Sequence, residues 1–388
     1  MTRSKVEAYQ ASAVKKSFKQ QEEEMSMSKV EEIQNYLQQN QIDAAFVTTP
    51  DNVFYVSGFK SNPHERLLGV MIFKNAEPFL ICPKMEIPDA KAAGWPYKVV
   101  GHQDTENSME VLAQTIKDRN VNPSAFAIEK AHLIVERFEA LQQSFPEANF
   151  VRLDEKINAL RVIKDEHELE KLRKAAELAD YAIEVGCKEI AEGKTEMEIV
   201  TAIESAIQEK GCKMSFETTV LSGPKTASPH GIPGSRKIEK GDMVLFDLGV
   251  NYDGYCSDIT RTVAFGEPSE AQKEIYHTVL AANTNAIAAV KPGVRAMELD
   301  KIARDTIADA GFGEYFTHRL GHGLGISVHE FPSVTGANEL IMEEGMVFTI
   351  EPGIYKSDVT GVRIEDDVVV TKDGVEVLTK FQKELIVL

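Results

Sequence analysis

The 388-residue sequence is poor in cysteine, and its four cysteines form no CxxC pair and no spacing typical of a disulfide framework or a zinc knuckle. It also lacks an apolar run long enough to span a bilayer. Residues 1–27 are rich in Lys, Gln and Glu and have no apolar stretch of the kind found in secretory signals. These absences predict a cytoplasmic protein with reduced thiols and no membrane segment.

Positive charge is the other scarce feature of the sequence. There are 43 Lys and Arg residues against 61 Asp and Glu residues, a formal net charge of −18. A field of this sign repels nucleic acid and anionic membranes, so we expect neither as a partner. Several of the acidic residues fall within apolar strand patterns, where a solvated surface charge is a poor explanation.

Length and pattern predict two domains. Residues 1–27 read as an exposed extension. Residues 28–153 alternate between amphipathic helices and apolar strands, which predicts a small α/β domain. Residues 154–164 are the expected linker, and residues 165–388 form the larger domain.

The larger domain shows the same pattern twice. Asp165 is a plausible N-cap for a helix that ends near Gly193. The remaining predicted elements follow in the order helix, strand, strand, then helix, helix, strand, strand: Glu196–Glu209, Met243–Val250, Tyr255–Phe265, Ala271–Val290, Ala296–Ala310, Met346–Tyr355 and Gly361–Val370. This predicts an α+β domain of two pseudo-symmetric αα-ββ halves.

The first predicted hairpin carries a pair of aspartates. Its turn, Asn251–Gly254, contains an Asp-Gly dipeptide. With the turn centred between Tyr252 and Asp253, Asp247 lies opposite Asp258 on one face of the strand pair. Facing like charges destabilise a hairpin unless a cation lies between them, so the pattern predicts a metal ion.

The second hairpin adds two glutamates. Glu351 ends an apolar strand, and Glu365 is expected inside the strand Val362–Val370, on the same face as Arg363, which could pair with a carboxylate. His322 lies between two glycines, which let a backbone approach closely.

These four carboxylates and one imidazole form an oxygen-rich set, which favours two divalent ions, Mn²⁺ or Co²⁺ before Zn²⁺. Two such ions lower the pKa of a shared water, so hydrolysis is the expected chemistry. Taken singly, each residue has an ordinary explanation as a surface charge, a salt bridge or a packing histidine. The combination is what predicts a site.

The same residues resemble the creatinase/aminopeptidase P/methionine aminopeptidase family, the pita-bread metallopeptidases, over about residues 28–388. The matching segments are Asp247-Leu248-Gly249, Asp258-Ile259-Thr260-Arg261, Gly321-His322-Gly323-Leu324-Gly325, His329-Glu330-Phe331-Pro332, Glu351-Pro352-Gly353-Ile354-Tyr355 and Val362-Arg363-Ile364-Glu365-Asp366. The resemblance implies a pita-bread catalytic domain preceded by a creatinase-like N-terminal domain, and a homodimer.

The resemblance also implies roles for individual residues. Asp247, Asp258, His322, Glu351 and Glu365 would hold two metal ions, with Asp258 and Glu365 bridging. Glu351 would in addition act as a general acid and base. His230, in Ser228-Pro229-His230-Gly231, would contact substrate, and His329 would stabilise the transition state. Arg363, or a basic residue near Arg66, would bind the substrate carboxylate.

Within the family the closest likeness is to bacterial Xaa-Pro dipeptidases, the prolidases, which hydrolyse the bond before proline. It is carried by His329–Ser333 and by the stretch Gly58–Arg66, a loop that in such enzymes takes part in substrate selection and would here include His64 and Arg66. Asn62 stands where an aspartate is expected, so the charge preference of this loop is open.

Three alternatives stay open at this point. Aminopeptidase P shares all five ligands but removes the first residue from longer peptides. A non-catalytic binding protein could use the same fold, although intact ligands weigh against it. Hydrolysis of non-peptide bonds is a third possibility as a side activity. The native metal and the preferred residue before proline are also open.

Overall fold

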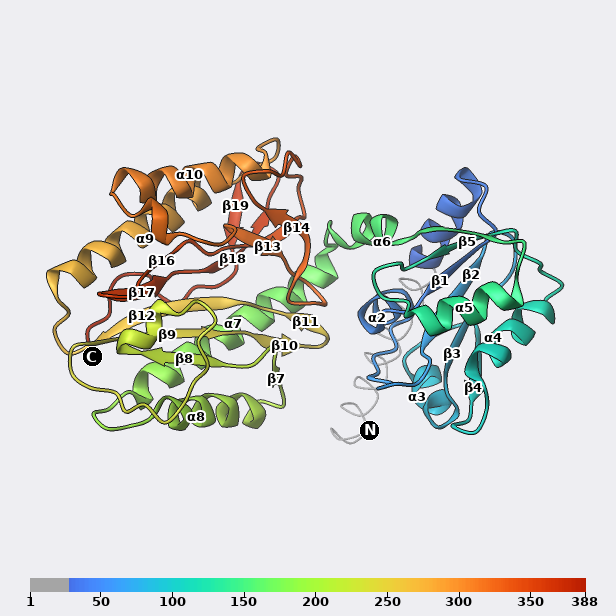
Figure 1. Ribbon diagram of the computed structural model, residues 1–388, viewed down its shortest axis with the longest axis horizontal. Coiled ribbons are helices and arrows are strands. Elements are labelled where there is room, and N and C mark those ends of the chain that lie inside the picture. Colours follow the sequence, from blue (N-terminus) through green and yellow to red (C-terminus); the bar gives the residue numbers. More distant parts are fainter. Residues whose placement is uncertain (1–27) are drawn as a thin grey trace, which may run out of the picture. The chain divides into compact units, whose positions relative to one another are not determined.

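The computed structural model describes residues 28–388, and the chain forms two compact units that divide between Ala159 and Leu160 (Figure 1). The predicted extension at 1–27 lies outside the described residues. The segment expected to link the domains contains helix α6 (Asp154–Arg161). Within residues 28–388, no helix combines the length and apolar character that crossing a bilayer requires.

The described part of the first unit is built on a six-stranded mixed sheet in the order β4-β3-β2-β1-β5-β6. β1 pairs antiparallel with β2 and parallel with β5, as expected when helices connect some strands and hairpins connect others. The strands are β1 (Ala44–Val47), β2 (Gly69–Phe73), β3 (Phe79–Pro83), β4 (Lys98–His102), β5 (Ala125–Ile128) and β6 (Asn149–Arg152). The helices are residues 28–39, α2 (Pro50–Ser57), α3 (Ile87–Ala92), α4 (Ser108–Lys117) and α5 (Val135–Ser144), with a short 3₁₀ turn, η1 (Lys84–Glu86).

The core of the first unit explains this arrangement. The central strands β1, β2 and β3 are apolar and buried on both faces, so each face of the sheet needs a covering layer there. Leu112 and Ile116 of α4 and Leu141 of α5 pack with Phe46 and Phe126 of the sheet in one cluster. The predicted small α/β domain is therefore confirmed.

The first half of the second unit contains α7 (Glu166–Glu189) and α8 (Glu196–Glu209), which begin with capping boxes at Asp165 and Thr195. Their apolar faces pack on a sheet of order β12-β9-β8. The remaining elements of this half are β7 (Lys213–Met214), β8 (Thr219–Ser222), η2 (Gly223–Ala227), β9 (Asp242–Leu248), β10 (Val250–Tyr252), β11 (Tyr255–Cys256) and β12 (Ile259–Phe265).

The second half repeats this plan. Helices α9 (Glu270–Ala288) and α10 (Ala296–Asp309) pack in a common core with a five-stranded sheet of order β14-β13-β15-β18-β19. Its elements are η3 (Gly313–Tyr315), β13 (Gly321–Gly323), β14 (Glu330–Val334), β15 (Val347–Ile350), β16 (Gly353–Lys356), β17 (Thr360–Arg363), β18 (Asp366–Val370) and β19 (Val375–Val377). The two αα-ββ halves are thus confirmed.

The register of the first hairpin differs from the prediction. Asp253 and Gly254 both adopt left-handed conformations, with φ of 47° and 92°, which is the backbone of a two-residue type I′ turn. Tyr252 therefore pairs with Tyr255, and Asp247 pairs with Thr260 rather than with Asp258. The predicted pairing was wrong by two residues, and such a shift preserves the face on which a side chain lies.

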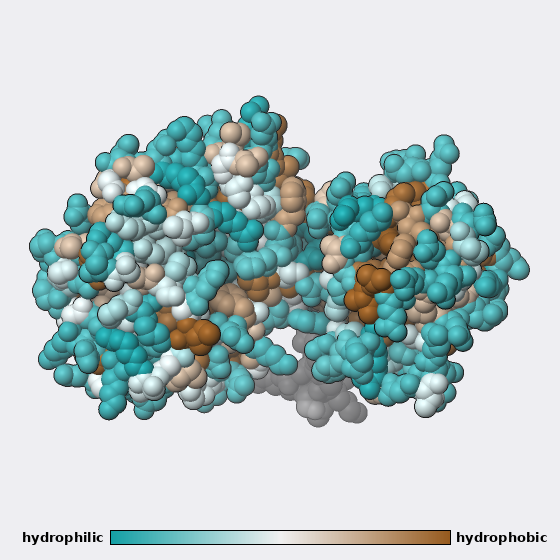
Figure 2. Space-filling model, in the orientation of Figure 1, coloured by the Kyte–Doolittle hydropathy of each residue, from teal (hydrophilic) through white to brown (hydrophobic). Residues whose placement is uncertain are grey.

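The visible surface is mostly hydrophilic (Figure 2). In Figure 2 the visible face of each unit is covered mainly by hydrophilic side chains, with hydrophobic ones in small groups. The large apolar side chains are instead concentrated in the three cores described above.

Candidate metal centre and active site

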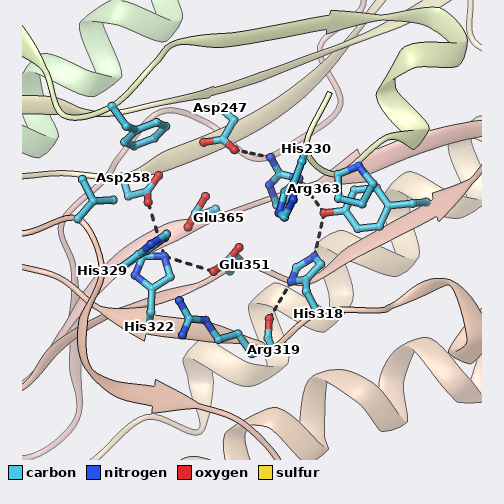
Figure 3. Close-up of a pocket in the computed structure, with 14 residues that line it drawn as sticks. His230, Asp247, Asp258, His318, Arg319, His322, His329, Glu351, Arg363 and Glu365 are labelled. Carbon is cyan, nitrogen blue, oxygen red and sulfur yellow. Dashed lines mark hydrogen bonds and ion pairs between the residues drawn. The ribbon is translucent and has the colours of Figure 1, made fainter. Parts of the chain in front are cut away.

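All five predicted ligands line one cavity of about 520 Å³ in the second unit. Figure 3 shows their side chains directed toward one another, although each comes from a different part of the fold. Asp247 lies on β9, Asp258 directly precedes β12, His322 lies on β13, Glu351 directly follows β15, and Glu365 lies between β17 and β18. Glu365 was expected inside a continuous strand, and the break between β17 and β18 corrects that prediction.

The position of His322 depends on its two glycine neighbours. A Cβ at Gly321 would lie 1.9 Å from the carbonyl oxygen of Thr349, and one at Gly323 would lie 2.2 Å from that of Phe331. Real Cβ atoms do not approach backbone oxygens this closely, so both positions require glycine. The close packing of β13 between β14 and β15 brings the imidazole to the carboxylates.

Three of the side chains form a compact cluster. One potential ligand atom from each of Asp258, His322 and Glu365 lies within 4.8 Å of the others. His322 Nε2 lies 3.7 Å from Asp258 Oδ2 and 3.4 Å from Glu351 Oε1. Asp258 Oδ1 and Glu365 Oε1 are buried and have no hydrogen-bond partner among the described residues. Buried carboxylate oxygens without donors are the feature expected where a cation would bind.

The electrostatics of the cluster support the same interpretation. Burial and the charge of Glu365 raise the pKa of Asp258 and of Glu351 well above their ordinary values, and burial with repulsion from Asp247 raises the pKa of Glu365 to about 7. Burial lowers the pKa of His322 to about 3, so its imidazole is neutral and able to coordinate a metal. Without a cation the site therefore favours the protonated forms of these carboxyl groups, and a bound cation would favour their ionised forms.

Arg363 is the buried cation beside this cluster. It forms an ion pair with Asp247, donates from Nε to Thr260 Oγ1 at 3.0 Å and donates from Nη1 to the Tyr355 hydroxyl at 2.7 Å. The predicted pairing of Arg363 with a carboxylate is observed, and its partner is Asp247. Tyr355 in turn lies 2.9 Å from His318 Nε2, so a polar chain runs along one wall of the cavity.

The two predicted catalytic histidines also line the cavity. The His329 ring lies edge-to-face against the His322 ring, with 4.2 Å between centroids, and burial followed by the charge of Arg319 lowers the pKa of His329. His230 is exposed and lies beside Arg363 (Figure 3). Both therefore face the space next to the carboxylates.

Five residues that line the cavity were not predicted from the sequence. His318, Arg319, Tyr355, Phe216 and Val328 also line the cavity. Burial lowers the pKa of His318 to about 4. Proximity in sequence was the signal for four of them, since His318 and Arg319 precede His322, Val328 precedes His329 and Tyr355 follows Glu351, and Phe216 had no signal of this kind.

His64 and Arg66 belong to the first unit and do not line this cavity. They line a separate hollow of about 590 Å³, where Arg66 Nε lies 2.7 Å from Asp104. His64 has a positive φ of 55°, a local strain in the loop. Their predicted contact with substrate stays a prediction.

A cluster of carboxylates and a neutral imidazole, on a fold of two αα-ββ halves, has the composition of a divalent-metal hydrolase site. Residues 170–372 match the model for metallopeptidase family M24, and residues 29–163 match the creatinase/prolidase N-terminal domain. The chain belongs to metallopeptidase family M24, a divalent-metal-dependent family, and carries the pita-bread catalytic domain behind a creatinase-type N-terminal domain.

Individual proteins agree with this assignment over nearly the whole chain. An uncharacterized peptidase of Staphylococcus haemolyticus is 50% identical over 92% of this chain and all of the relative. A solved Xaa-Pro dipeptidase from Bacillus anthracis is 35% identical, with a TM-score of 0.87, 94% of this chain covered and 100% of the other. A solved X-Pro aminopeptidase from Thermotoga maritima is 34% identical, with a TM-score of 0.81, 90% of this chain covered and 98% of the other.

Proposed function

We propose that this metallopeptidase hydrolyses the peptide bond before proline in Xaa-Pro dipeptides, as a prolidase. The observation that carries the proposal is the convergence of Asp247, Asp258, His322, Glu351 and Glu365 on one cavity of an M24 fold. The name of the similar Bacillus anthracis enzyme supports the substrate class. A proline amide has no N–H, so a peptidase that grips that hydrogen loses a contact there, and a dedicated site is useful.

We propose two divalent ions per chain, which Asp247, Asp258, His322, Glu351 and Glu365 would hold. Four carboxylates balance the charge of two dications, and the oxygen-rich set favours Mn²⁺, with Co²⁺ or Zn²⁺ as alternatives. The unpartnered oxygens of Asp258 and Glu365 support this assignment. When bound, the ions polarise the scissile carbonyl and supply a water of lowered pKa.

The protein's own groups would then act as follows. Glu351 accepts a proton from the attacking water and delivers it to the proline nitrogen, as a general base and acid. His329, neutral because burial lowers its pKa, donates its N–H to the developing oxyanion. His230 contacts the proline end of the substrate. Arg363, held by Asp247 and Tyr355, attracts the free carboxylate of a dipeptide.

A second candidate is aminopeptidase P, because the similar Thermotoga maritima protein is named as an X-Pro aminopeptidase. The test is hydrolysis of Leu-Pro beside Leu-Pro-Gly, with added Mn²⁺ and with a chelator. Manganese-dependent cleavage of the dipeptide is expected. Preferential cleavage of the tripeptide would assign aminopeptidase P, and no cleavage of either would refute an activity on Xaa-Pro bonds.

We propose further that the protein works in the cytoplasm as a homodimer, and that His64 and Arg66 help to select substrate. The double variant His64→Ala, Arg66→Ala should raise KM for Leu-Pro with little change in kcat. An unchanged KM would refute a role in substrate binding. Sedimentation velocity tests the dimer.

A further inference from the structure

The segment Thr379–Lys383 is connected by hydrogen bonds, each through another residue, to the main chain beside the candidate ligands, although none of its residues lines the cavity. Its contacts run through buried polar residues that the catalytic proposal leaves without a role. Arg261, Asn283 and Asp366 are each 1% exposed or less. Buried polar groups of this kind need a complete set of partners, which the segment supplies.

Arg261 on β12 is the first of these connections. Its Nη1 donates to the carbonyl oxygen of Glu365 at 2.5 Å and to that of Thr260 at 3.0 Å. Its Nη2 donates to Asp366 Oδ1 at 2.7 Å. Its Nε and its Nη2 also donate to the carbonyl oxygen of Phe381, at 3.0 and 2.7 Å. Arg261 therefore joins the main chain of Glu365 to the 379–383 segment.

Lys383 makes the second connection. Its Nζ donates to Asp366 Oδ2 and to Asn283 Oδ1, both at 3.0 Å. Asn283 on α9 in turn donates to the carbonyl oxygens of Ile350 at 3.0 Å and Ile364 at 3.3 Å. These two carbonyls directly precede the two glutamates of the candidate metal centre, so Lys383 orients the amide that holds both.

Thr379 makes the third connection. Its hydroxyl donates to Asp366 Oδ1 at 2.9 Å and accepts from the backbone N–H of Asp367 at 3.2 Å. Asp367 Oδ2 then accepts from the backbone N–H of Asp258 at 2.9 Å. The segment thus reaches a third candidate ligand through one intermediate residue.

We infer that Thr379–Lys383 is a positioning element of the metal centre, which fixes the main chain at Asp258, Glu351 and Glu365. The inference rests on the proposed ligand set. Without these hydrogen bonds the carboxylates would move apart in the metal-free protein. Bringing them back together would cost free energy on metal binding, so the Kd for the metal would rise. Groups that orient metal ligands from outside typically change metal affinity by about 10- to 100-fold when removed.

The experiment compares Lys383→Met and Thr379→Val with the control Lys380→Met, which removes an exposed lysine of the same segment. Each full-length protein is stripped with a chelator, checked by circular dichroism and titrated with MnCl₂ in a calorimeter. Both test variants should bind Mn²⁺ about 10- to 100-fold more weakly than wild type, and the control should not. Turnover of both should recover at saturating Mn²⁺, which a general loss of folding would not allow.

The outcomes separate this inference from the function on which it rests. Wild-type protein that binds neither Mn²⁺ nor, in the same titration, Co²⁺ or Zn²⁺ would overturn both. Wild-type binding with folded variants of unchanged affinity would overturn the positioning role alone, as would equal weakening by the Lys380→Met control. Should Lys383→Met fail to fold, Thr379→Val decides, because valine matches the shape of threonine and removes only the hydroxyl.

Discussion

The pKa of Glu365 predicts how stability depends on pH when no metal is bound. This carboxyl group has an ordinary pKa of 4.5, which burial and Asp247 raise to about 7 in the folded protein. The folded state therefore holds a proton that the unfolded state releases. Stability must then fall as pH rises from about 4.5 to about 7, with the loss complete above pH 7.

The size of the effect follows from the shift. The full window corresponds to roughly 3 kcal/mol at 1.36 kcal/mol per pKa unit, and the part between pH 6 and pH 8 to roughly 1.4 kcal/mol. A bound metal replaces the proton and should remove the loss. At a free Mn²⁺ concentration about 100 times its Kd, the ion would add about 2.7 kcal/mol of stability.

The assay is urea unfolding of chelator-treated protein at pH 6, 7 and 8, followed by circular dichroism. Glu365→Gln is the matched variant, because glutamine keeps the shape and cannot ionise. Its stability should be flatter with pH than that of wild type by about 1.4 kcal/mol over this range. Trp95, the single tryptophan, is buried in the first unit, so its fluorescence reports on that unit. As an internal control, it should show the same pH dependence in wild type and in Glu365→Gln. Equal pH profiles for wild type and Glu365→Gln would refute the reasoning.

Three further predictions follow from the cavity. His329→Ala should lower kcat by about 10²- to 10³-fold while metal content by mass spectrometry stays at the wild-type level, and normal turnover would exclude His329 as the oxyanion donor. Arg363→Met leaves Asp247, whose side chain is 22% exposed, without its partner and should cost about 1–3 kcal/mol in urea unfolding of chelator-treated protein, whereas a loss below about 0.5 kcal/mol would mean that the pair is dispensable. Gly323→Ala places a Cβ 2.2 Å from a backbone oxygen and should cost about 3 kcal/mol or more, unlike Gly374→Ala, whose Cβ meets nothing within 4 Å, and equal effects of the two substitutions would contradict the packing argument.

Local chemistry explains why the elements of the second unit were predictable. Asp165 and Thr195 each accept a hydrogen bond from the backbone three residues later, and the glutamates at those positions return the bond, so both helix starts are encoded within four residues. The glycines around His322 likewise signal a close backbone approach by their identity alone.

The first hairpin shows where local reasoning failed. The residues of the turn were recognised, but the register depends on which two of them adopt a left-handed conformation, and here these are Asp253 and Gly254. A turn centred one position earlier, between Tyr252 and Asp253, is equally compatible with the residue types of this segment. The shift changed the partner of Asp247 from Asp258 to Thr260, while both carboxylates still reach the cavity because the side-chain period of a strand is two.

The amino-acid sequence by itself determined the two-domain plan, the repeated αα-ββ pattern and the residue types that suit a divalent metal, because each of these is expressed over short stretches of chain. Only the tertiary structure decided which groups meet. Thr260 and Glu365 are 105 residues apart and lie 2.7 Å from each other, and His318 reaches Tyr355 across the cavity wall. The first of these contacts follows from how the sheets of the two halves pack and the second from how strands and loops meet within the second half. The periodicity of a single segment carries no information about the packing partner of another.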